Sequence, residues 1–190
     1  MKKTLTVLAA GIMMLLGIQA YAQPKVELGY LNSTLKADLD FGDIAGSDNG
    51  NGFYIGFKYG IPVSLDQKFV FEPGLEFNFL SFDGSSMTYL RAPIHLNYNL
   101  EVAPDMDLFF GAGPGLVLGL SGDDDVYDSD YGVLKRFNLQ LGIEMGFRFS
   151  ARYEVRVGYD WGVLDIADGL LADFGDAHQH NLHIGVGYVF

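Results

Sequence analysis

The chain has 190 residues, enough for one domain, and contains 25 Gly, 15 Phe and 11 Tyr but no Cys. Its formal net charge of −12 argues against nucleic acid as a partner, because two strongly negative molecules repel each other. Without cysteine no disulfide can staple the fold, so stability has to come from elsewhere.

The first 22 residues have the organisation of a secretory signal peptide. Lys2 and Lys3 precede the apolar run 5–18, and the small-residue site Ala20-Tyr21-Ala22 follows it. Cleavage after Ala22 would leave a mature domain of residues 23–190 with 24 acidic and 10 basic side chains, a net charge of −14. The alternative, an uncleaved anchor, is disfavoured because the apolar run is short of a full membrane span. The sequence therefore predicts an exported protein.

The stretch 181–190 alternates apolar and polar residues up to the end of the chain. One reading is a C-terminal edge strand of a soluble sandwich. However, an aromatic carboxyl terminus on an outward apolar strand is typical of outer-membrane barrels, which present it to their insertion machinery. We expect Tyr188 and Phe190 to form such a signal, with the barrel assembly machinery as a partner.

The mature chain contains eight segments of this alternating character. Several of them have about 9–11 residues, the length that a tilted strand needs to cross a bilayer. One face of each segment is bulky and apolar, and we expect the opposite face to carry only Gly, amide or charged side chains. The segments are 25–32, 52–61, 69–79, 89–101, 108–120, 137–149, 153–162 and 181–190.

The polar faces separate a membrane barrel from a soluble one. Glycine is a poor choice for a water-exposed strand but suits a small closed barrel, where side chains crowd toward the axis. The apolar faces carry aromatics near the strand ends, the arrangement found at the two bilayer interfaces. The sequence thus predicts an all-β, eight-stranded antiparallel up-and-down transmembrane barrel, a monomer in outer-membrane lipids. The expected girdles are Tyr59, Phe69, Phe71, Tyr98, Phe110, Phe149, Tyr153, Tyr188 and Phe190 at one end, and Phe53, Phe79, Phe137 and Trp161 at the other.

The connections between segments differ in length on the two sides. Apart from 83–87, the shorter ones are 62–68, 102–107 and 150–152, and we expect them to face the periplasm. The long, Asp-rich connections are expected outside the cell: 33–51, 121–136 and 163–179.

Four short motifs carry a resemblance to a known family. Residues 89–98 (YLRAPIHLNY), 110–115 (FGAGPG), 136–138 (RFN) and 159–163 (YDWGV) occur in the order found in the PorT-like outer-membrane β-barrel family. The chain resembles this family, which groups with OmpA-like eight-stranded barrels, over residues 23–190. The resemblance implies fold and location; some members assist protein secretion.

Many charged side chains fall on the inward face. Charges in a low-dielectric interior must pair or neutralise, so the favoured interpretation is an ion-pair network that plugs the lumen. The alternative is a narrow gated conduit for ions or small solutes, although an eight-stranded lumen is only wide enough for side chains. The predicted network is Lys25, Glu27, Lys58, Glu72, Glu76, Arg91, Glu101, Glu144, Arg148, Glu154, Arg156 and Asp160, with His95 and His183 on the same face.

The loops offer weaker candidates for chemistry. The acidic run 123–130 matches no EF-hand spacing, and His178 and His180 share a strand face that His183 does not, so no metal site is predicted. A rim enzyme would need Ser129, Asp165, Asp176 and His178 to gather, but no spacing makes them a triad. We predict a non-catalytic barrel without cofactor, with a structural or surface-interaction role and an unidentified loop ligand.

Overall fold

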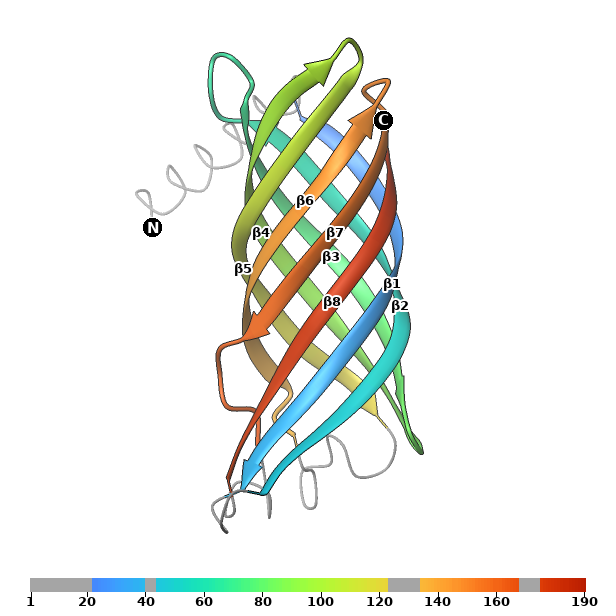
Figure 1. The fold of residues 1–190 in the computed structure, drawn as a ribbon, viewed down its shortest axis with the longest axis vertical. Helices are drawn as coiled ribbons and strands as arrows, with labels where there is room; N and C mark the ends of the chain where they lie inside the picture. The colour runs from blue at the N-terminus through green and yellow to red at the C-terminus, as the bar shows by residue number, and fades with distance from the viewer. Residues whose placement is uncertain (1–21, 40–43, 123–133, 168–174) are drawn as a thin grey trace, which may run out of the picture.

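The structure is a computed structural model that describes residues 22–39, 44–122, 134–167 and 175–190. Eight antiparallel strands follow one another in chain order, and β8 pairs with β1 to close a single barrel (Figure 1). This confirms the predicted fold; the predicted signal peptide lies outside the described residues. The strands are β1 (Gln23–Leu39), β2 (Ile44–Pro62), β3 (Phe69–Phe82), β4 (Ser85–Ala103), β5 (Met106–Gly122), β6 (Phe137–Phe149), β7 (Tyr153–Gly162) and β8 (Gly175–Val189).

The alternation of the sequence becomes an inside and an outside. On β6, Gln140 is fully buried, while Leu141 and Ile143 are about half exposed on the outer face. All eight strands present large apolar side chains outward in this way, a surface that suits hydrocarbon rather than water. Within the described residues, no helix is long and apolar enough to cross a membrane.

Aromatic rings pair across the strands near both ends of the barrel. Phe53 stacks on Phe79 with ring centroids 4.8 Å apart. At the other end, Tyr188 lies edge-on to Tyr153 at 5.5 Å and to Phe190 at 5.1 Å. These pairs fall at the positions where the sequence predicts the two girdles.

The two ends of the barrel differ. At one end, called here the terminal end, β1 begins and β8 finishes beside the short turns β2–β3, β4–β5 and β6–β7 (Figure 1). Within the described ranges, the non-glycine residues with positive φ are all in these turns, namely Gln67, Asp105, Ser150 and Ala151. The opposite end, called the loop end, carries the β1–β2, β3–β4, β5–β6 and β7–β8 connections.

At the loop end the strands are longer than predicted. The predicted loop 33–51 is mostly a continuation of the β1–β2 hairpin, because backbone pairing runs on from Ser33–Gly50 to Leu39–Ile44. Polar side chains replace the apolar ones on the outer face there: the Thr34 hydroxyl donates to Asn49 Oδ1 at 2.8 Å. The predicted connections 83–87 and 163–179 are likewise shortened, since β4 begins at Ser85 and β8 at Gly175.

Candidate functional site: the charged lumen and its terminal vestibule

Arg156 on β7 is the centre of the lumenal charge network. Its Nε lies 2.6 Å from Glu27, and Nη1 lies 3.0 Å from Glu72 and 2.9 Å from Glu144. Its Nη2 lies 2.5 Å from Glu154. The planar guanidinium has five N–H donors, so one side chain can hold these carboxylates from four strands together.

Two lysines add further ion pairs to the network. Lys25 on β1 pairs with Glu72 and, at 3.0 Å, with Glu154. Lys58 on β2 lies 2.9 Å from Glu27 and 3.3 Å from Glu76. The Lys25 ammonium therefore bridges two carboxylates, and that of Lys58 bridges three, since it also lies 3.6 Å from Glu144.

A second cluster lies deeper in the lumen, toward the loop end. Arg91 on β4 contacts Glu76 at 2.8 Å and pairs with Asp160 on β7. The Nδ1 atom of His183 lies 3.3 Å from the other Asp160 oxygen. His95 Nδ1 lies 3.1 Å from Glu144, which joins this cluster to the Arg156 group.

Eleven of the twelve residues predicted for the network are buried together inside the barrel. Glu101 is the exception: it is exposed at the terminal end, two residues before β4 finishes, so its predicted place in the buried network is wrong. The buried set comprises the cations Lys25, Lys58, Arg91, Arg148 and Arg156, and the carboxylates Glu27, Glu72, Glu76, Glu144, Glu154 and Asp160. Five positive charges thus face six negative ones, with His95 and His183 beside two of the carboxylates.

Glycines on the inner face make room for these large side chains. A methyl group at Gly158 would collide with the imidazole of His183, and one at Gly142 would collide with the Asp160 carboxylate. The glycine-rich inner faces therefore reflect crowding at the barrel axis, as the sequence suggested.

Not all of the inner face is Gly, amide or charge, and that expectation is wrong at the loop end. There the lumen is filled by an apolar plug, defined as the buried cluster Leu31, Tyr54, Leu80, Met87, Tyr89, Val117, Leu134, Ile166, Ala167 and Ala177. The space between the plug and the Arg91 cluster leaves no volume for a water molecule. Apolar side chains can close this end without the free-energy cost of burying a charge, so no ion-pair partner is needed.

A short segment supplies part of the plug, namely Ile166 and Ala167. Residues 163–167, called here the clip, follow β7 and lie against the start of β8 and residues 134–136. Asp165 Oδ1 accepts the backbone N–H groups of Ala167 and Ala177, each at 2.9 Å. Its other oxygen pairs with Lys135 Nζ at 3.2 Å. One carboxylate thus ties three segments together over the lumen.

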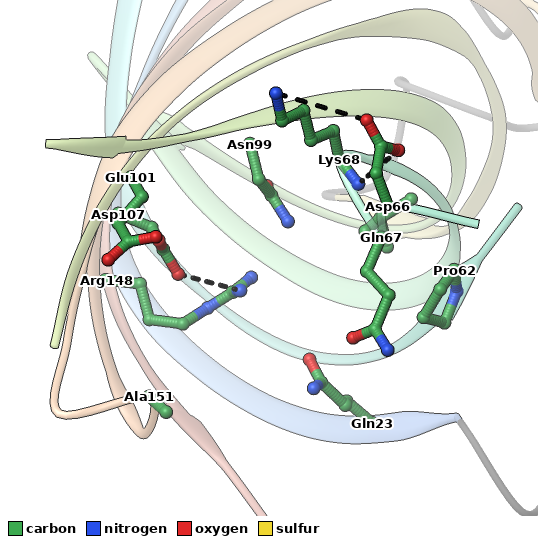
Figure 2. A pocket seen from close by; sticks show the side chains of 11 residues that line it. Gln23, Pro62, Asp66, Gln67, Lys68, Asn99, Glu101, Asp107, Arg148 and Ala151 are labelled. Atoms are coloured by element: carbon green, nitrogen blue, oxygen red, sulfur yellow. Dashed lines mark hydrogen bonds and ion pairs between the residues drawn. The ribbon is translucent and has the colours of Figure 1, made fainter. Parts of the chain in front are cut away.

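The other end of the lumen is open. A cavity of about 260 Å³, called here the terminal vestibule, lies inside the barrel mouth (Figure 2). Figure 2 shows Asp66, Gln67 and Lys68 of the β2–β3 turn on one side and Glu101 and Asp107 on the other. The polar lining of the vestibule includes Asp66, Lys68, Asn99, Glu101, Asp107 and Arg148.

Arg148 separates the vestibule from the charge network. Its Nε and Nη2 each lie 2.7 Å from Glu154, while Nη1 lies 3.7 Å from Asp107. The side chain is 8% exposed, so its guanidinium closes the floor of the cavity.

The residues predicted for rim chemistry do not meet in the described part of the chain. Asp165 is committed to the clip, and His178 Nδ1 contacts the Leu164 carbonyl at 3.1 Å. Asp176 lies next to Ala177 at the start of β8, and Ser129 and the acidic run 123–130 lie outside the described residues. Among described residues, no group of three His, Cys, Asp or Glu side chains could hold a metal ion.

Comparison with known proteins gives one family and several similar folds. The model of the outer membrane protein beta-barrel domain family matches residues 5–190. The attachment invasion locus protein Ail of Yersinia pestis is 16% identical, with 90% of this chain and 99% of that one covered and a TM-score of 0.51. Neisserial surface protein A is 15% identical, with coverages of 87% and 97% and a TM-score of 0.51. Both likenesses concern the fold. The comparison with curated proteins gave no match.

Proposed function

Because the chain belongs to the outer membrane protein beta-barrel domain family, we propose that it acts as a closed, non-conducting barrel with a surface-interaction role. Barrels of this type have short periplasmic turns and longer extracellular loops, which puts the terminal end in the periplasm and the loop end outside the cell. Its lumen serves as a structural core rather than a path.

The filled lumen is the observation that carries this proposal. Five cations and six carboxylates interlock across the barrel, and no room for a water molecule remains between the Arg91 cluster and the apolar plug. A path for ions would need Arg91, Asp160 and Tyr54 to move at once, and breaking buried pairs by separating partners is costly.

The extended hairpin supports the surface role. At 17 and 19 residues, β1 and β2 exceed the roughly 9–11 residues that cross a bilayer, so their loop-end halves reach beyond the membrane. The polar ladder there includes Asn32 Nδ2, which donates to Asn51 Oδ1 at 3.0 Å. A hairpin stiffened by cross-strand hydrogen bonds offers a partner a pre-ordered surface, which lowers the entropic cost of binding.

Several finer features belong to the same proposal. We propose a monomer without catalytic activity, since Asp165 and His178 are committed to backbone contacts in the described loops. The closer likeness to PorT-like barrels, and with it an accessory role in secretion, rests on the four sequence motifs alone.

Conductance across a planar lipid bilayer tests the proposal. Refolded protein should give no discrete current steps, whereas steps that scale with salt concentration would favour the narrow conduit. Replacing Arg91 and Tyr54 by Ala in one chain is the matched positive control, because it removes side chains from both the charge cluster and the plug. The control should conduct if the assay can detect an opened lumen.

A further inference from the structure

Carboxylates outnumber cations in the lining of the terminal vestibule, with Asp66, Glu101 and Asp107 against Lys68 and Arg148. No ion pair reaches Glu101 in the described part of the chain, although its carboxylate lines the cavity. Asn99 Oδ1 is buried there without a hydrogen-bond partner. Asp107 has only the 3.7 Å contact to Arg148. Three neighbouring oxygen-bearing side chains are therefore free to accept.

Of the two cations in the vestibule, Arg148 is held tightly by another carboxylate and Lys68 only weakly. Arg148 directs two of its donor nitrogens to Glu154, each at 2.7 Å. Lys68 lies 4.0 Å from Asp66, and both side chains are about half exposed in the turn.

A ligand that fits this balance carries donors and positive charge. Ammonium and guanidinium groups are donors only, and they have no acceptor that Glu101 or Asn99 would leave unpaired. A bare metal ion fits less well, because no group of three His, Cys, Asp or Glu ligands forms among the described residues. An anion would meet Glu101 and Asp107 as like charges.

We propose that the terminal vestibule binds an organic cation, either an ammonium or a guanidinium group, with Glu101, Asn99 and Asp107 as acceptors. The cavity, about 260 Å³, has the volume of roughly eight or nine water molecules, enough for one small polar group. Two sources share this chemistry: a free amine, or a basic side chain of a polypeptide in the periplasm.

Nuclear magnetic resonance titration of the refolded, full mature chain in detergent tests the site. The probes are methylguanidinium chloride and a capped Gly-Arg-Gly peptide, with sodium acetate as the opposite charge. Both cationic probes should shift the amide signals of Gln67, Asn99 and Glu101 saturably, and the shifts should weaken as salt is added. Comparable shifts with acetate, or none with either cation, would overturn the proposal.

Two variants make the result specific. Glu101→Gln keeps the size of the side chain and should weaken binding about fivefold, the effect of losing one partly exposed charge pair. Asp83→Asn, the same change in the β3–β4 turn at the opposite end, should leave the affinity unchanged. Equal affinities for both variants and the parent would rule out Glu101 as a ligand and the proposal with it.

The two probes also separate the sources. Tighter binding of the peptide by about tenfold would indicate contacts with its backbone and a polypeptide partner. Equal affinities would indicate a small free cation, and either result supports the cation site. The proposal does not depend on whether the lumen conducts, because the vestibule lies between Arg148 and the terminal end of the barrel.

Discussion

At the scale of single residues, the face of the strand on which a side chain lies, toward lipid or toward the lumen, determines which polarity is tolerated there. Ile143, at the middle of β6, is 51% exposed on the outer face, and Gln140 on the same strand is fully buried. We expect Ile143→Arg to lower the free energy of unfolding by about 2–4 kcal/mol, the cost of an arginine at the bilayer midplane. Unfolding by urea in lipid vesicles measures it.

Gln140→Arg is the matched control for the face assignment. It adds a cation to a lumen in which carboxylates outnumber cations, so its effect should differ from that of Ile143→Arg and depend on nearby acids. Equal, small effects at the two positions would show that the assignment of faces is wrong.

Arg156 is the residue whose loss should matter most to the network. Arg156→Met keeps much of the volume but leaves Glu27, Glu72, Glu144 and Glu154 without their shared cation. We expect the free energy of unfolding to fall by about 3–5 kcal/mol, because breaking a buried pair leaves uncompensated charge. Arg152→Met, in the exposed β6–β7 turn, should cost far less; similar losses for both would contradict the central role of Arg156.

The sequence predicts whether a side chain faces the lumen or the lipid better than it predicts which residues form ion pairs with each other. Period-two alternation placed Arg156, Lys58 and Glu144 inside, because every second residue of a strand shares a face. It did not pair Arg156 with Glu72 on β3, since that contact spans the lumen and depends on the closure of the whole barrel. Glu101 was misplaced because alternation does not show where the barrel mouth begins.

At the scale of elements, the alternation predicted the strands but not their full length. Outside the membrane the outer face of the β1–β2 hairpin becomes polar, as at Thr34 and Asn49, so its pattern resembles that of a loop. The apolar plug was missed for the opposite reason: in pairs such as Phe79-Leu80, one apolar residue faces lipid and the next faces the lumen. Adjacent apolar residues on a strand were the available signal.

The clip gives the loop end a pH dependence. Burial opposes ionisation of Asp165, but the N–H groups of Ala177 and Ala167 and the charge of Lys135 outweigh it and hold the pKa of this carboxyl below its ordinary value. The clip is therefore stabilised above about pH 3.9, the unfolded value, and this stabilisation is lost as the pH falls through the lower folded value. We expect the amide signals of Ala167 and Ala177 to titrate together with a midpoint below about pH 3.9.

Asp165→Asn is the control for this titration, because the amide keeps an acceptor oxygen but has no proton to gain. The variant should show no transition in these two amide signals between acid and neutral pH. A midpoint at or above the ordinary carboxyl value, or an unchanged transition in the variant, would contradict the assignment to Asp165.

The end of β8 connects folding to assembly in cells. Phe190 follows β8, is 71% exposed and donates its backbone N–H to the Pro24 carbonyl at 3.0 Å. Deleting Phe190 should lower the outer-membrane yield in cells more than the unfolding midpoint in detergent, because one interfacial ring is a small part of the barrel. Deleting residues 181–190 should abolish folding in both settings, since β1 would lose most of its partner. An unchanged cellular yield without Phe190 would remove its role as an assembly signal.

At the scale of the whole molecule, closure and a filled interior act together. A barrel in which β8 pairs with β1 has no free strand edge. Detergent therefore has no edge strand that it could separate from the rest of the sheet. The interlocked charges and the apolar plug add a core that spans the lumen, so that disrupting one strand disturbs ion pairs to several others. Unfolding should therefore be a single cooperative event with a high barrier.

This barrier should be visible on a denaturing gel. Protein kept in SDS without heating should remain a compact barrel and migrate differently from a boiled sample, which is an extended chain. Arg156→Met should convert to the boiled form at a lower temperature than the parent, because its core retains unpaired carboxylates. Identical migration of heated and unheated protein would contradict a closed barrel, and an unchanged conversion temperature in the variant would show that the charge network contributes little to the barrier.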